Sequence, residues 1–70
     1  MISEDRKQEL TRKGYYVEDM GAEYGPEWKG QFRWMNNIAA DFQDDDTSFS
    51  VEDTWDSADH HEQHTGTQNA

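Results

Sequence analysis

The stretch from residue 41 to residue 62, DFQDDDTSFSVEDTWDSADHHE, contains nine carboxylate side chains and neither lysine nor arginine. Carboxylates at alternate positions of a twelve-residue loop are typical of helix–loop–helix calcium sites. Asp41, Asp45 and Glu52 fall at the first, fifth and twelfth positions of such a loop. The sixth position, where the sharp turn requires glycine, is Asp46, and no pair of amphipathic helices flanks the loop. We therefore expect solvated carboxylates here rather than a specific calcium site.

Three histidines, His60, His61 and His64, form a second cluster of possible ligands. On a helix, His60 and His64 lie four residues apart and could chelate one metal ion, with Asp56 a turn earlier. The chain has no other histidine and no cysteine to complete such a site. Histidines near the end of a helix also interact favourably with the helix dipole. We predict no metal ligands and no cofactor, although the residue types alone leave metal binding by His60 and His64 open.

Other catalytic arrangements are missing from the sequence. Ser48, Ser50 and Ser57 lack the glycine-bounded turn that exposes a serine nucleophile. Acid–base catalysis by paired carboxylates needs one buried member with a raised pKa, and the acidic residues here lie in polar surroundings. No glycine-rich phosphate loop is present, and the net charge of −10 has the wrong sign for direct binding of nucleic acid. We expect a protein that is not an enzyme.

The charges are distributed unevenly along the chain. Residues 1–14 carry four basic and three acidic side chains, whereas nine acidic and no strongly basic side chains follow Trp34. Carboxylates one helical turn apart are about 5–6 Å from each other, comparable to phosphates along a nucleic-acid strand. Such a row could occupy a groove lined with lysine and arginine. The predicted partner-binding residues are Asp44, Asp45, Asp46, Glu52, Asp53, Asp56 and Asp59, with Tyr24 and Trp28 as partly exposed aromatic anchors.

Two helices are predicted to support these residues. The first is capped by Ser3 and ends at Gly14, and the second begins after Ser50. In the second helix, one arc is expected to face a sheet: Val51, Thr54, Trp55 and Ala58. The opposite arc is expected to face solvent: Glu52, Asp53, Asp56 and Asp59.

Alternating polarity predicts strands between the helices, at residues 15–20 and 31–36. A helix over residues 26–42 is the alternative, with Gly30 counting against it. Asn36 and Asn37 suit a turn into a short third strand within residues 38–49. The predicted fold class is α+β, with an N-terminal helix, two or three short antiparallel strands and a C-terminal acidic helix. Residues 1–64 form the single domain, and residues 65–70 form a disordered tail.

The segment GYYVEDMGAEYGPEWKGQFRWMNN, together with the length and charge of the chain, resembles small acidic phage and prophage proteins. That class includes anti-CRISPR inhibitors and other DNA mimics. Its members differ in fold, so no functional residue is carried over. The resemblance implies an inhibitor that acts in the host cytosol on a nucleic-acid-processing complex.

These observations lead to one leading hypothesis and one alternative. The first is a non-catalytic acidic inhibitor that blocks a basic nucleic-acid-binding site on a partner, such as an anti-CRISPR acting on a host defence complex. The alternative is a phage accessory or assembly domain that self-associates through aromatic side chains. The thin core and the open sheet edges favour a homodimer. The sequence has no apolar run of about 20 residues and no signal peptide, so we expect a cytoplasmic protein that does not enter membranes.

Overall fold

The N-terminal helix begins and ends where the sequence predicts. In the computed structural model, which describes residues 1–43 and 47–66, helix α1 comprises Glu4–Arg12. The Ser3 hydroxyl accepts a hydrogen bond from the Arg6 backbone N–H at 3.1 Å, which caps the first turn. Gly14 follows the helix with a φ of +103°, a conformation that favours glycine. Leu10 is fully buried and fixes α1 to the core.

Three antiparallel strands form one sheet in the order β1-β2-β3: β1 is Tyr15–Asp19, β2 is Phe32–Asn36 and β3 is Asp41–Phe42. In the turn after β2, the Asn36 side chain accepts hydrogen bonds from two backbone N–H groups at 2.9 Å. The predicted α+β fold is confirmed, and the helical alternative for residues 26–42 is wrong.

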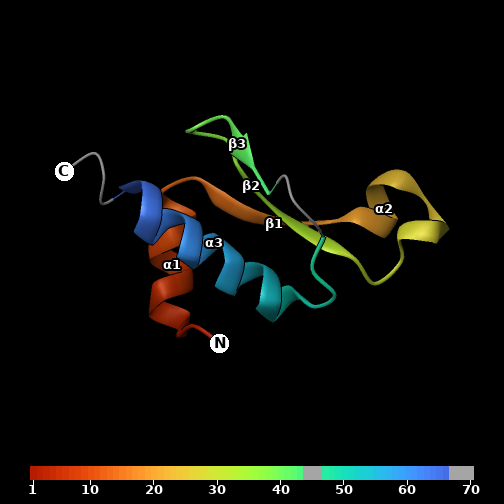
Figure 1. Cartoon of the computed structure of the whole chain (residues 1–70), viewed down its shortest axis with the longest axis horizontal. Coiled ribbons are helices and arrows are strands. Elements are labelled where there is room, and N and C mark those ends of the chain that lie inside the picture. Colours follow the sequence, from red (N-terminus) through yellow and green to blue (C-terminus); the bar gives the residue numbers. More distant parts are fainter. Residues whose placement is uncertain (44–46, 67–70) are drawn as a thin grey trace.

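The connection between β1 and β2 is partly helical. It contains the short helix α2, Met20–Tyr24, and the 3-10 turn η1, Pro26–Trp28, which together we call the α2–η1 lobe. The Asp19 carboxylate caps α2 by accepting hydrogen bonds from two backbone N–H groups at 3.0 and 3.3 Å. A Cβ atom on Gly21 would lie 2.9 Å from the Lys29 Cα, so glycine permits this tight packing. The lobe projects at the end of the molecule away from α1 and α3 (Figure 1).

Helix α3, Val51–Gly66, starts after Ser50, whose hydroxyl accepts a hydrogen bond from the Asp53 N–H at 3.0 Å. It runs two residues past the expected domain boundary, and residues 67–70 of the predicted tail lie outside the described residues. Thr54 and Ala58 are fully buried, as expected, but Val51 remains 41% exposed. The expectation that Val51 faces the sheet is therefore wrong; it lies in the first turn, outside the core cluster.

Both long helices pack on the same face of the sheet (Figure 1). The hydrophobic core joins one residue of α1, two of the sheet and one of α3: Leu10, Tyr15, Trp34 and Ala58. Ile2 and Trp55 pack against this cluster and remain partly exposed. In the part of the chain that the structure describes, no helix combines the length and apolarity required to cross a membrane.

Candidate functional site

Two of the acidic residues predicted to face solvent on the second helix, Glu52 and Asp59, form ion pairs with α1. Arg6 Nε lies 2.5 Å from an Asp59 carboxylate oxygen, and Lys7 Nζ lies 2.8 Å from Glu52. The N-terminal amino group lies 3.1 Å from Asp56. The expected solvent-facing arc is therefore wrong for Glu52 and Asp59, because α1 packs beside this side of α3 and brings basic side chains to it.

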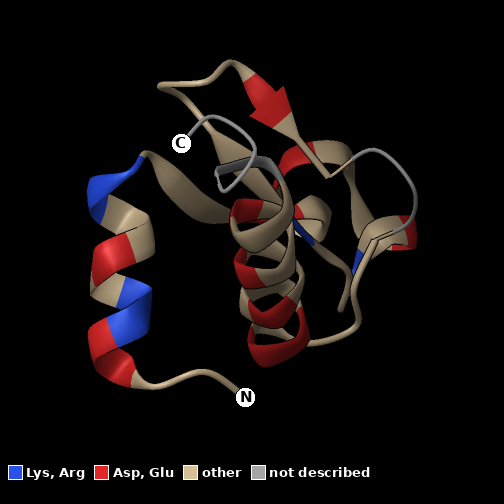
Figure 2. Ribbon diagram, turned by 60° about the vertical axis from the view of Figure 1, so that its left-hand side comes forward, with Lys and Arg blue, Asp and Glu red and all other residues tan. Residues whose placement is uncertain are grey.

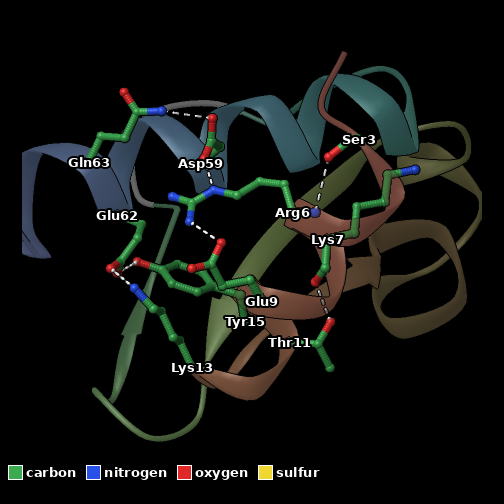
Figure 3. A network of polar contacts seen from close by, with 10 residues as sticks. All are labelled: Ser3, Arg6, Lys7, Glu9, Thr11, Lys13, Tyr15, Asp59, Glu62 and Gln63. Atoms are coloured by element: carbon green, nitrogen blue, oxygen red, sulfur yellow. Dashed lines mark hydrogen bonds and ion pairs between the residues drawn. The ribbon is translucent and has the colours of Figure 1, made fainter.

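The same pairing continues to the C-terminal part of α3. Lys13 Nζ lies 2.7 Å from Glu62, and Figure 3 shows this contact beside the one between Arg6 and Asp59. Figure 2 shows α1 with its lysine and arginine positions next to α3, whose acidic positions recur along the helix. Part of the acidic charge in the C-terminal half of the sequence is thus paired with basic charge from its N-terminal segment. Basic residues near the N-terminus neutralise acidic residues of α3.

Two pKa shifts accompany these contacts. The hydrogen bond from Arg6 lowers the pKa of Glu9 below its ordinary value of 4.5, and the nearby guanidinium charge acts in the same direction. The hydrogen bond to Glu52 raises the pKa of Lys7 above 10.5, despite the opposing effect of burial. Each shift favours the charged form of the group concerned, the Glu9 carboxylate and the Lys7 ammonium.

These shifts predict how stability depends on pH. The contribution of Glu9 is present above about pH 4.5 and is lost as the pH falls through its lowered folded-state pKa. The contribution of Lys7 is present below about pH 10.5 and is lost only as the pH rises through its raised folded-state pKa. We expect E9Q to lose less stability than the wild type below pH 4.5 in thermal melts. The exposed carboxylate of Asp5 forms no ion pair among the described residues, so D5N is the control. Equal acid sensitivity of E9Q and the wild type would contradict this assignment.

The remaining predicted acidic residues do not form one surface in the described part of the chain. Asp53 is exposed and forms no ion pair with another described residue. Asp44, Asp45 and Asp46 lie outside the described residues. Of the predicted acidic set, Asp53 is therefore the member that the structure places on an outward surface without a counter-charge.

The two predicted aromatic anchors lie together on the α2–η1 lobe. Tyr24 is 53% exposed and Trp28 is 38% exposed. Each follows an exposed glutamate, Glu23 or Glu27, that forms no ion pair among the described residues. Sequence reasoning missed these two glutamates, although the repeated acid–aromatic pairs in EYGPEW are a visible signal. The lobe therefore combines large exposed rings with carboxylates that lack an internal partner in the described chain.

A concave region lies between α3 and β3. It has a volume of about 310 Å³, and its lining includes Trp34, Asp41 and all three histidines. His61 Nδ1 lies 2.7 Å from the Tyr15 hydroxyl, its Nε2 lies 3.0 Å from Asp41, and its ring centroid is 4.4 Å from that of Trp34. No local pattern predicts the contact between Tyr15 and His61, because the two residues are 46 positions apart. Since Tyr15 is only 2% exposed, the arrangement attaches α3 to the sheet instead of presenting a reactive group.

The other two histidines lie side by side on α3. The ring centroids of His60 and His64 are 4.2 Å apart, as their spacing on a helix predicts. Within residues 1–43 and 47–66, no three or more histidine or acidic side chains are grouped so that they could hold a metal ion. The geometry here supplies two adjacent rings rather than a set of metal ligands.

No protein-family model, no curated protein and no solved structure matches this chain. The α2–η1 lobe is the region of the described structure where predicted binding residues are both exposed and grouped.

Proposed function

We propose that the protein is a non-catalytic acidic inhibitor that blocks a basic nucleic-acid-binding site on a partner protein, and that it docks through the α2–η1 lobe. One observation carries the proposal. Tyr24 and Trp28 are exposed on a projecting lobe, each next to a carboxylate without an ion pair in the described chain.

The aromatic side chains supply the apolar anchors. Tyrosine and tryptophan are enriched among the residues that contribute most to protein–protein binding, because they bury large rings at small cost in conformational entropy. Arg33 donates a hydrogen bond to the Tyr24 hydroxyl at 3.3 Å, and its guanidinium lies 5.9 Å from the Tyr24 ring centroid. Tyr24 is thus held in place before binding, which reduces the ordering cost of association.

The net charge of the chain favours a partner with a basic surface. Four of the six lysine and arginine residues form ion pairs with other described residues: Arg6, Lys7, Lys13 and Arg33. The net charge remains −10, so the field around the molecule attracts basic surfaces. A groove lined with lysine and arginine, as found in proteins that bind DNA or RNA, is complementary to the lobe.

The proposed mechanism is occlusion. The lobe covers the basic groove, its carboxylates take the positions of phosphates, and nucleic acid is excluded without any covalent step. In line with the resemblance to anti-CRISPR and other DNA-mimic proteins, we propose that the partner belongs to a host defence complex that processes nucleic acid.

Affinity capture tests this function. The protein is immobilised and exposed to nuclease-treated lysate from a bacterium that carries defence systems, and bound proteins are eluted with duplex DNA, with single-stranded RNA or with salt. We expect nucleic-acid-binding proteins that are retained at about 0.05 M salt, released at about 0.5 M salt and displaced by DNA or RNA. Retention that neither nucleic acid nor salt affects would contradict the proposal.

A further inference from the structure

The face of the sheet opposite α1 and α3 carries a row of apolar side chains that crosses all three strands. Tyr16 of β1 is paired with Met35 of β2, which is paired in turn with Phe42 of β3. Residues paired in this way project from the same face of the sheet. Tyr16 is 42% exposed and Phe42 is 46% exposed, whereas Met35 is partly buried between them. We call this row, with the adjacent Glu18 and Arg33, the open sheet face.

The charges on the open sheet face balance each other. Arg33 Nη2 lies 3.0 Å from a Glu18 carboxylate oxygen, and these residues are also cross-strand partners. The Arg33 guanidinium lies 5.6 Å from the Phe42 ring centroid, within the range of a cation–π contact. Among the described residues, this face therefore combines exposed rings with no net charge, in a chain whose net charge is −10.

We propose that the open sheet face binds a second copy of this chain. Two copies with a net charge of −10 each repel one another, and the repulsion is smallest where both contacting patches are locally neutral. A two-fold symmetric contact brings the same patch of each copy together and so satisfies this condition on both sides. A basic partner is instead attracted to the acidic lobe. The charge pattern thus assigns the two surfaces to different occupants.

The area of the open sheet face is small for a protein–protein interface. Strands of five residues, at about 3.3 Å per residue and about 4.8 Å between strands, form a patch of a few hundred Å². Stable interfaces bury about 800 Å² on each partner. The patch is smaller than this, so we expect a weak, concentration-dependent dimer.

Salt distinguishes this dimer from binding at the lobe. Screening reduces the repulsion between two acidic copies, whereas burial of the rings is little affected by salt. Dimerisation should strengthen as salt is raised, while binding of a basic partner to the lobe should weaken. Failure of one proposal therefore leaves the other unaffected.

Sedimentation equilibrium of the whole chain tests the proposal, at concentrations up to about 1 mM and at about 0.05 and 0.5 M salt. We expect reversible dimers favoured by high salt, and dimerisation weakened at least tenfold in Y16E. V51E is the matched control, because it adds the same charge at a residue of similar exposure, 41%, on a helix that covers the other face. A wild-type chain that stays monomeric throughout, or equal weakening in V51E, would overturn the proposal.

A second measurement uses only the wild type and so does not depend on whether Y16E folds. Backbone and side-chain NMR spectra of the wild type are recorded across the same concentration range. Concentration-dependent shifts should map to Tyr16, Met35 and Phe42, and shifts confined to other surfaces would also overturn the proposal.

Discussion

Replacement of Trp34 by alanine is expected to leave about half of the protein or more unfolded at 25 °C. Trp34 is 3% exposed, its Nε1 donates a hydrogen bond to the Ser57 hydroxyl at 3.1 Å, and its ring packs edge-on against Tyr15 at 5.3 Å between centroids. Truncation of a buried tryptophan costs about 3–5 kcal/mol. The core of a chain this small supplies only about 3–5 kcal/mol of net stability. The single substitution therefore removes about as much free energy as the fold possesses.

Circular dichroism melts and urea titrations measure this effect. The matched control is W28A, which removes the same side chain from a site that is 38% exposed and outside the core cluster. We expect W28A to unfold cooperatively at nearly the wild-type temperature. A W34A variant that melts within a few degrees of the wild type would show that Trp34 does not hold the core together.

Much of the fold was predictable because its signals are local. Ser3, Gly14 and Ser50 mark helix ends through capping hydrogen bonds or a left-handed backbone, and these depend on one or two turns of chain. The alternation of polar and apolar residues in β1 and β2 likewise reflects the two faces of the sheet. The third strand was expected to be short, and it contains two residues.

The candidate site was less predictable because it depends on which elements become neighbours. A helical wheel places Glu52 and Asp59 away from the sheet, but it contains no information about a second helix on that side. The contacts of these residues with Lys7 and Arg6 span more than 40 positions of sequence. The helical structure of the lobe was not predicted, for another reason. Its glycines and its proline indicate a loop, yet the Asp19 cap and the close packing at Gly21 turn the segment into a small ordered structure.

The charge distribution illustrates how composition alone can mislead. Nine acidic residues after Trp34 predict an outward acidic surface. In the folded chain, Glu52, Asp56, Asp59 and Glu62 each have a cationic partner from the N-terminal segment. These four carboxylates are therefore less available to a partner than exposed carboxylates without an ion pair. Among the described residues, Glu23 and Glu27 on the lobe are exposed and form no ion pair.

Simultaneous replacement of Tyr24 and Trp28 by alanine is the second change with a large expected effect. Interface residues of this kind cost about 2 kcal/mol or more each when truncated, so the double variant should lose roughly 1,000-fold or more in affinity for a captured partner. The fold should persist, because both side chains are exposed and lie outside the core cluster. Melts of Y24A/W28A confirm folding before binding is measured.

Competition binding of these variants tests the proposed site most directly. A partner purified from the capture experiment is titrated with wild type, Y24A/W28A, F49A and E52Q/D59Q in the presence of labelled DNA or RNA. F49A removes an aromatic ring that is 76% exposed outside the lobe, and E52Q/D59Q neutralises carboxylates that already have internal partners. We expect Y24A/W28A to stop displacing nucleic acid while F49A and E52Q/D59Q displace it as the wild type does. Full displacement by Y24A/W28A, with loss of displacement in E52Q/D59Q, would contradict docking through the lobe.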